Sequence, residues 1–224
     1  MSGRLALIPL VAALALLAVG LSPAQPVAGS FEAVVKDDSG KPLVDAVVFL
    51  TPRDLASVSP RTAPETMDQQ NKEFVPHVLP ISVGTAVSFP NRDNIRHHVY
   101  SFAPAERFEL PLYIGTPAAP VVFDKPGVVV LGCNIHDWMV GYIYVLPTPY
   151  FAKTGEDGTA RLAEIPPGPY AARVWHPRLR GEPDKSGKPI TIAAGEPGRA
   201  AFVVALKREW RLQQRPRYEG PQGG

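Results

Sequence analysis

Residues 132–141, GCNIHDWMVG, contain the only cysteine of the chain, followed by a histidine and a methionine at intervals of three positions. A thiolate, an imidazole and a thioether belong to the donor set of a type 1 copper site. In such a site two histidines and one cysteine lie in a plane, and a methionine is the weak axial ligand. The spacing therefore predicts that Cys133, His136 and Met139 are three of four copper ligands.

The lone thiol leaves other chemistry open. One cysteine forms no disulfide within the chain, so the Cys133 thiol is buried, paired between chains or bound to a ligand. A buried inert thiol is the plain alternative. A nucleophile–base pair of Cys133 and His136 is another, although the neighbouring sequence supplies no convincing orienting group or oxyanion site. A Zn²⁺ site of cysteine and histidines would leave Met139 without a purpose.

The fourth ligand should be a histidine on a distant strand, and residues 91–102, NRDNIRHHVYSF, offer His97 and His98. This stretch resembles the ligand-bearing segment of small cupredoxins, and amicyanin most of all. Aligned on Asn91 and Val99, the resemblance places the ligand at His97. Strand alternation agrees, because His97 would then point to the same side as Val99. The short spacing of the cysteine loop is also similar to that of amicyanin.

The resemblance extends over residues 74–145 and departs from the family pattern at two positions. His98 stands where cupredoxins usually have an asparagine that braces the cysteine loop, and Gly132 stands where a bulkier residue often precedes the cysteine. These departures leave the ligand set intact and affect the surroundings that tune it. Four further residues are candidates for a supporting or extra role at the site: His98, Asn91, Trp138 and His77.

The resemblance implies one type 1 copper ion per chain, outer-sphere transfer of one electron, and no enzymatic chemistry. In cupredoxins the histidine of the cysteine loop reaches the surface through an apolar patch, so His136 would be the exit for the electron, with Trp138 beside it. A redox protein, either a dehydrogenase or a cytochrome, would be the partner. Proteins of this appearance are in some cases labelled methylamine-utilisation proteins.

The elements that position these residues read as an all-β fold. Proline and glycine are frequent, with 26 and 19 residues, and they separate short runs rich in Val, Ile and Phe. Residues 51–72 are polar and without period, and are predicted to be a loop or linker. Strands are predicted over 31–50 on both sides of a turn, 78–83, 86–89, 99–102, 121–123, 128–133, 141–147, 159–165, 170–176, 189–194 and 200–206.

The two ends of the chain share a style that the middle lacks. GKPLVDAVVFL near the beginning and DGTARLAEIPPGPYAARVWHP near the end resemble the two recurring stretches of transthyretin-like, carboxypeptidase-regulatory-type sandwiches. The resemblance implies a small sandwich from residues 30–66 plus 150–207, split by a cupredoxin Greek-key sandwich at 70–148. The alternative is one continuous sandwich to which the first strands are added. Residues 208–224 are polar, rich in proline and glycine, and predicted to be disordered.

The first residues indicate export. Arg4 precedes an apolar run at 5–19 and a small-residue exit, so residues 1–24 are predicted to be a cleaved signal peptide, with a retained anchor as the alternative. The protein would be periplasmic or secreted, with no stable membrane insertion after cleavage. The formal net charge of +2 gives no indication of a nucleic-acid partner. Two other functions stay open: a copper-storage module without electron transfer, and a metal-free envelope scaffold or adhesion protein.

Overall fold

The structure is a computed structural model that describes residues 28–117, 119–183 and 187–208. The predicted signal peptide and residues 209–224 of the predicted tail lie outside the described residues. Strands account for nearly all regular structure, and a 3-10 turn, η1, covers Leu55–Ser57. The all-β fold class is confirmed. In the same part of the chain, no helix has the length and apolarity that crossing a membrane requires.

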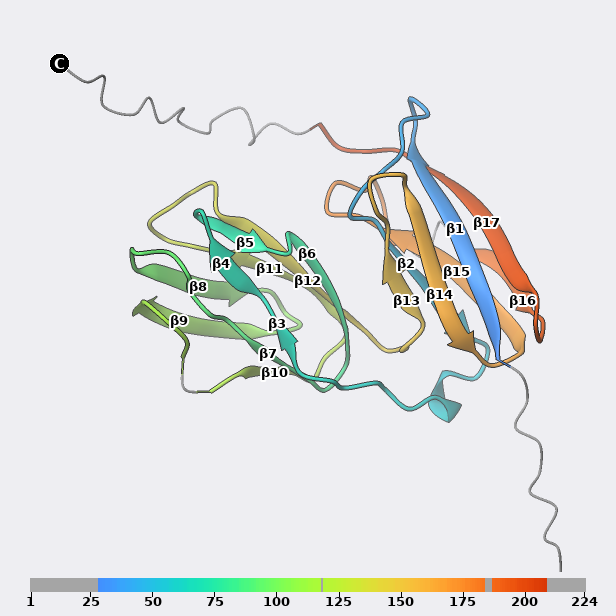
Figure 1. The fold of residues 1–224 in the computed structure, drawn as a ribbon, viewed down its shortest axis with the longest axis horizontal. Helices are drawn as coiled ribbons and strands as arrows, with labels where there is room; N and C mark the ends of the chain where they lie inside the picture. Colours follow the sequence, from blue (N-terminus) through green and yellow to red (C-terminus); the bar gives the residue numbers. More distant parts are fainter. Residues whose placement is uncertain (1–27, 118, 184–186, 209–224) are drawn as a thin grey trace, which may run out of the picture.

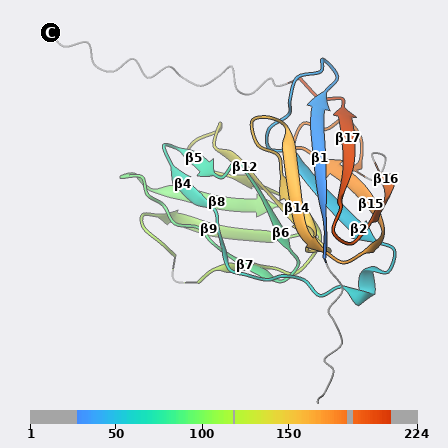
Figure 2. The ribbon, with the colours of Figure 1, turned by 45° about the vertical axis from the view of Figure 1, so that its right-hand side comes forward.

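The strands form two sandwiches side by side (Figures 1 and 2). The central sandwich has one five-stranded sheet in the order β6-β12-β11-β8-β9 and a facing three-stranded sheet in the order β10-β7-β3, with the hairpin β4-β5 beside them. Its strands are β3 (Glu65–Thr66), β4 (Asp68–Gln70), β5 (Glu73–Val75), β6 (Val78–Ser82), β7 (Thr85–Ser88), β8 (His97–Phe102), β9 (Arg107–Tyr113), β10 (Val121–Phe123), β11 (Gly127–Gly132) and β12 (Val140–Leu146).

The flank sandwich is made from both ends of the described chain. One sheet has the order β14-β1-β17 and the other the order β13-β2-β15-β16. Its strands are β1 (Gly29–Asp37), β2 (Val47–Pro52), β13 (Phe151–Lys153), β14 (Thr159–Ile165), β15 (Gly168–Trp175), β16 (Lys188–Ile192) and β17 (Pro197–Val204). β1 therefore lies between two strands that follow it by more than a hundred positions, antiparallel to β14 and parallel to β17. The transthyretin-like assignment of these strands stays a prediction.

Alternation of side chains explains why the segments form half-buried strands. Along β1 buried and half-buried residues alternate over its first six positions, and β12 does the same before its last residue. Alternating strands place one apolar face against the opposite sheet, and this burial is the main favourable term in folding. Each sandwich has its own core: Phe31, Val48 and Val174 are buried in the flank, and Phe89, Phe123 and Leu131 in the centre.

A third apolar cluster joins the sandwiches. Val47 and Phe49 of β2 and Trp175 of β15 are buried against Val78 of β6 and Leu146 of β12. Tyr144 of β12 lies within this contact, with its ring centroid 4.8 Å from that of Trp175. The facing side chains exclude water from the boundary, so the two sandwiches share buried surface in addition to the chain that connects them.

Five strands lie where the sequence predicts none. β3 and β4 fall within residues 51–72, predicted to be a loop, β5 and β13 fall between predicted strands, and β9 falls within a proline-punctuated stretch. β3 and β9 are edge strands, and β9 carries the exposed Pro111. An edge strand tolerates proline because one side of it needs no ladder hydrogen bond, and its exposed positions blur the apolar alternation.

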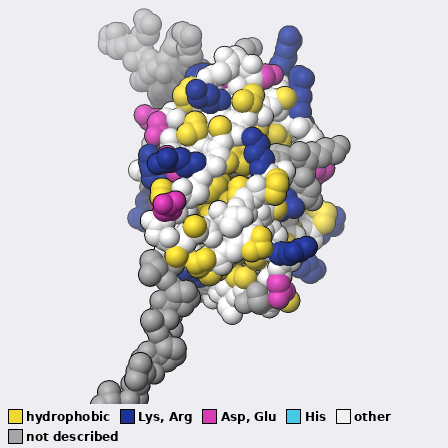
Figure 3. All heavy atoms as spheres, turned by 90° about the vertical axis from the view of Figure 1, so that its right-hand side faces the viewer, with side chains coloured by type: hydrophobic (Ala, Val, Ile, Leu, Met, Phe, Trp, Pro, Cys, Tyr) yellow, Lys and Arg dark blue, Asp and Glu magenta, His cyan; other side chains and the backbone are white. Residues whose placement is uncertain are grey.

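The outer face of the flank sandwich shows basic, acidic and hydrophobic side chains interspersed (Figure 3). This mixture agrees with the near balance of 23 basic and 21 acidic residues in the whole sequence.

Candidate metal centre

His97 begins β8 and is fully buried, as is Val99 two positions later, whereas Phe102 at the other end of the strand is 71% exposed. The predicted direction of His97, inward with Val99, agrees with this burial. A register shift in the β8–β9 ladder between His97 and Val99 interrupts the alternation. Such irregularities redirect side chains locally, and the neighbouring His98 is buried as well.

The cysteine loop runs from the end of β11 to the start of β12. Gly132 pairs with Val140, so the two strands hold both ends of the loop in register. Within it the Met139 amide donates a hydrogen bond of 2.9 Å to the His136 carbonyl. Cys133 and Met139 are buried and His136 is half-buried. A tight loop with both ends fixed thus carries three of the predicted ligands.

The structure brings three of the four predicted ligands together. Ligand atoms of His97, Cys133 and His136 all lie within 4.8 Å of one another. The Cys133 Sγ is 3.8 Å from the His136 Nδ1, and the two histidine ring centroids are 5.0 Å apart. Met139, the fourth, is buried in the same apolar cluster as Cys133.

Asp93 orients His97. The His97 Nε2 lies 2.7 Å from the Asp93 Oδ2. Because an ionised carboxylate accepts hydrogen bonds and donates none, Nε2 carries the proton in this pairing and Nδ1 keeps a free lone pair. The His97 Nδ1 is buried and has no hydrogen-bond partner. A buried polar atom without a partner is costly, and a metal ion at this position would supply the partner.

Backbone N–H donors keep the Asp93 carboxyl group ionised, so that it accepts hydrogen bonds. Burial raises its pKa, but the amides of Lys72 and Asn71 and the contact with His97 outweigh burial and leave the pKa below its usual value. The pKa of His136 is also lowered, first by burial and then by positive charge on His97 and Lys72. The His136 imidazole can therefore present a neutral nitrogen to a metal at neutral pH, which is the form that ligates.

The donors fit a soft metal ion. One sulfur and two imidazole nitrogens converge, and a thioether lies in the surrounding core. Thiolate, imidazole and thioether together are the donor set of a type 1 copper site. A structural zinc site would ordinarily have four cysteine or histidine donors, and the converging group found among the described residues has three.

The supporting candidates have different places in the structure. Asn91 is buried and donates from its amide to the carbonyls of Ile95 and Tyr113, at 2.9 and 2.8 Å, so it shapes the loop that leads to His97. His98 lies outside the converging group, with its Nε2 2.9 Å from the Glu109 Oε1 but outside hydrogen-bond alignment. Its ring faces that of Tyr100 at 5.4 Å.

Trp138 and His77 differ in their distance from the site. The Trp138 ring lies 5.2 Å from the ring of His136. His77 is exposed just before β6, and its ring packs on the edge of Tyr142 at 5.3 Å. It therefore stands apart from the converging group.

Several supporting residues escaped the sequence reading. Asp93, Asn71 and Lys72 act on His97 as described, and Gln69 is fully buried beneath the same loop. The Gln69 side-chain Nε2 donates hydrogen bonds to the backbone carbonyls of Phe89 and Pro90, both at 3.3 Å. The available signals were an aspartate four positions before the ligand histidine and an Asn-Lys pair between two short strand-like runs. Neither signal indicates by itself which loop it will contact.

Tyr100 accounts for the small residue before the cysteine. A Cβ atom added at Gly132 would lie 2.8 Å from both the Cζ and the hydroxyl oxygen of Tyr100. The space that a larger residue would fill is therefore already occupied by a ring from the neighbouring strand. The departure from the cupredoxin pattern at Gly132 thus has a local steric reason.

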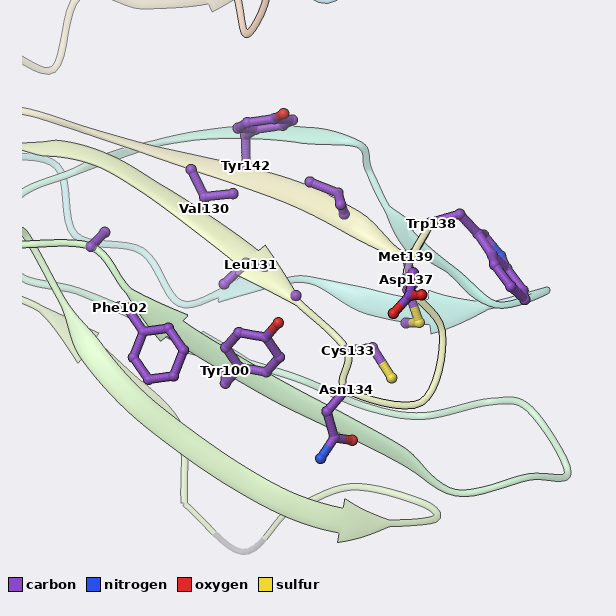
Figure 4. Close-up of a pocket in the computed structure, with 13 residues that line it drawn as sticks. Tyr100, Phe102, Val130, Leu131, Cys133, Asn134, Asp137, Trp138, Met139 and Tyr142 are labelled. Atoms are coloured by element: carbon purple, nitrogen blue, oxygen red, sulfur yellow. The ribbon is translucent and has the colours of Figure 1, made fainter. Parts of the chain in front are cut away.

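An open groove runs along this face to the cysteine loop. Figure 4 shows Cys133 and Asn134 just beyond the end of β11, with Tyr100 and Phe102 on the neighbouring strand. Trp138 lies at the far end of the groove and Val130 and Tyr142 along its side. The groove is largely aromatic and apolar, with Asn134 and Asp137 as its polar positions.

No protein-family model and no curated protein matches the sequence. Similar solved structures include a Cu-containing nitrite reductase from Thermus scotoductus, at 30% identity and a TM-score of 0.35. The match covers 43% of this chain and 25% of the reductase, so the chain spans about a quarter of that protein's length.

Two smaller proteins match over almost their whole length. A purple cupredoxin from Nitrosopumilus maritimus is 25% identical, with a TM-score of 0.33, and the match covers 38% of this chain and all of that one, 100%. A reduced amicyanin variant is 21% identical, with a TM-score of 0.34, over 44% of this chain and 99% of that one.

Proposed function

We propose that the central sandwich holds one type 1 copper ion and passes single electrons between redox partners. The observation that carries the proposal is the convergence of the Cys133 Sγ, the His136 Nδ1 and the buried, unpartnered Nδ1 of His97. Copper at this position would supply one-electron exchange. Thiolate and thioether donors favour its reduced state, and imidazole serves both states.

The residues would act by holding their positions. His97 is fixed by Asp93, and Cys133 and His136 by a loop whose ends are paired. Rigid donors reduce the rearrangement between the two oxidation states, which keeps electron exchange fast. The Cys133 and Met139 side chains are only 3% and 1% exposed. That burial supports outer-sphere transfer over substrate chemistry at the metal.

We place the exit for the electron at His136. Its imidazole is half-buried, next to Trp138, and the adjacent Ile135 is 47% exposed. An apolar surface around a ligand lets a partner approach closely with little desolvation cost. A redox protein, a dehydrogenase or a cytochrome, is the proposed partner, and the periplasm or the extracellular space is the proposed location. The flank sandwich, proposed to be transthyretin-like, would be the non-redox part of the molecule.

The test is a titration of the purified protein with Cu(II). We expect an intense blue band from thiolate-to-copper charge transfer, with one copper bound per chain, and Cys133→Ala should remove the band. A colourless copper complex would favour the storage function instead. A protein that binds no copper would contradict both and leave the metal-free scaffold.

A further inference from the structure

We infer that the hairpin of β4 and β5 is a positioning element for His97, acting through Asp93. The inference rests on the proposed function in taking His97 as a metal ligand. The two residues between the strands, Asn71 and Lys72, have φ angles of 55° and 59°. A two-residue hairpin connection with both φ values positive turns its strands tightly and matches their twist.

The turn binds the Asp93 carboxylate through two backbone N–H donors. The Asn71 amide donates to the Asp93 Oδ1 at 2.7 Å, and the Lys72 amide donates to the Oδ2 at 2.9 Å. The same Oδ2 accepts from the Nε2 of His97 at 2.7 Å. The carboxylate is thus held at both oxygens, and its position fixes the direction in which the His97 ring presents its Nδ1. Neither turn side chain is needed for this grip, since the donors are main-chain groups.

Further contacts bind the hairpin to the same loop. The Gln69 backbone N–H donates to the Pro90 carbonyl and the Arg92 backbone N–H donates to the Gln69 backbone carbonyl, both at 2.9 Å. Arg92 and Asp68 form an ion pair. The Gln69 side chain is fully buried below the loop and also contacts the Tyr113 hydroxyl. The hairpin therefore cannot shift without moving the loop that carries Asp93.

The hairpin also touches the other half of the site. Phe74 of β5 is 2% exposed, and a Cβ added at Gly141 would lie 2.7 Å from the Phe74 Cβ. Gly141 lies two positions after Met139, at the start of β12. One short element thus contacts both segments that carry predicted ligands, the loop before His97 and the strand after Met139. That placement distinguishes a positioning element from an ordinary surface hairpin.

The experiment uses a matched pair of substitutions at one position. Lys72→Val and Lys72→Gly both remove the lysine side chain, but a β-branched residue is a steric outlier at φ near +60° and glycine is not. We follow the ring Nε2–H proton of His97 by NMR in the metal-free protein. In the wild type it should exchange slowly with water, because it is buried against Asp93.

The slow signal should persist in Lys72→Gly and exchange faster in Lys72→Val. Asp93→Ala should abolish it. If the valine variant folds poorly, Lys72→Ala is the second test of the hairpin, because alanine is strained at φ near +60° but less than a β-branched residue, and it should lie between glycine and valine. A signal unchanged in Lys72→Val, or lost equally in both Lys72 variants, would overturn the inference. In the copper-loaded protein, Asp93→Ala should weaken copper affinity by about 10- to 100-fold, and Lys72→Val should weaken it in the same direction by less.

The two proposals fail separately. The NMR comparison needs no metal, so the hairpin can be shown to position His97 even if the wild-type protein binds no copper. Conversely, a blue wild-type protein whose Nε2–H signal is indifferent to the Lys72 variants would keep the copper site and reject the hairpin.

Discussion

Adjacent histidines at the start of β8 have different surroundings, and the site depends on which of them ligates. His97 presents an unpartnered Nδ1 to Cys133 and His136, while His98 faces Glu109 and Tyr100. Both are buried, so burial alone does not separate them. The distinction comes from Asp93, which holds the one and not the other.

Replacement of either histidine should therefore give different results. In His97→Ala the thiolate-to-copper band should disappear, because the plane of three strong donors is broken. In His98→Ala the band should persist with a shifted maximum, since only the surroundings change. Visible absorption after titration with Cu(II) measures both. The reverse pattern would mean that His98 is the ligand.

The flank sandwich has a buried histidine of its own. His176 is 8% exposed, and its Nδ1 accepts a hydrogen bond of 3.1 Å from the Arg178 amide. Burial, followed by the positive charge of Arg178, lowers the pKa of His176 to about 4. The folded protein therefore binds a proton here less readily than the unfolded chain, in which histidine has its ordinary pKa of about 6.5.

His176 should make the folded state less stable in mild acid. Its contribution is complete above about pH 6.5, falls as the pH drops toward 4, and changes no further below that. Between pH 7 and pH 5 the loss should be on the order of 2 kcal/mol. Urea denaturation of the metal-free protein at both pH values measures it. His176→Gln should reduce the difference between the two pH values, and an equal difference in both proteins would refute the assignment.

At the scale of elements, close backbone approach matters more than side-chain length. The β5 hairpin strand lies so near β12 that Gly141 has no room for a methyl group beside Phe74. At Gly132 the obstacle is instead the far end of the Tyr100 side chain, which borders an open groove. The two glycines should therefore respond differently to the same substitution.

Gly141→Ala should destabilise the protein by about 3 kcal/mol, because the Phe74 Cβ cannot move without its backbone. Gly132→Ala should cost about 1 kcal/mol, because the Tyr100 ring can swing into the groove. Urea midpoints of the two metal-free variants test the order. Equal losses, or a larger loss at Gly132, would contradict the steric argument.

The sequence predicted elements well where an apolar alternation reaches the core. β7, β11 and β12 lie close to their predicted ranges, because their inward-facing residues are apolar and pack in the core of the central sandwich. β9 and the β4–β5 hairpin were not predicted, because they are held by edge pairing, buried amide contacts and a left-handed turn. The convergence of His97, Cys133 and His136 could be predicted from residue type and spacing. The supporting roles of Asp93 and Gln69 could not be predicted, because each depends on contacts between the β4–β5 hairpin and the loop before His97, which are distant in sequence.

For the whole molecule, the boundary between the sandwiches is a stability element. Trp175 is 7% exposed, and its ring lies near those of Tyr144 and Tyr142 across the boundary. Interface side chains of this size contribute as core residues do, because their removal leaves a cavity. The two sandwiches should therefore unfold together in the wild type.

Trp175→Ala should cost about 3–5 kcal/mol and should separate the unfolding of the two sandwiches. Phe102→Ala is the control, since that ring is 71% exposed and its loss should change stability little. The sequence has three tryptophans, at 138, 175 and 210, so the variant is made in a Trp210→Phe background, where Trp138 is the only fluorophore left beside Trp175→Ala. Chemical denaturation followed by this fluorescence and by far-ultraviolet circular dichroism then compares the central sandwich with the whole. Coincident transitions in Trp175→Ala, with an unchanged midpoint, would show that the boundary contributes little.

Because the central sandwich is inserted in sequence between the strands of the flank sandwich, the two sandwiches become complete at different times during synthesis. All the sheets of the central sandwich are built from β3–β12, so every strand that they need is present once residue 146 has been synthesised. β1 and β2 emerge first but lack β13–β17 until the chain is nearly complete. The proposed metal site can thus form before β1 and β2 have their partners. During this interval the unpaired edges of these two strands are open to pairing with other chains.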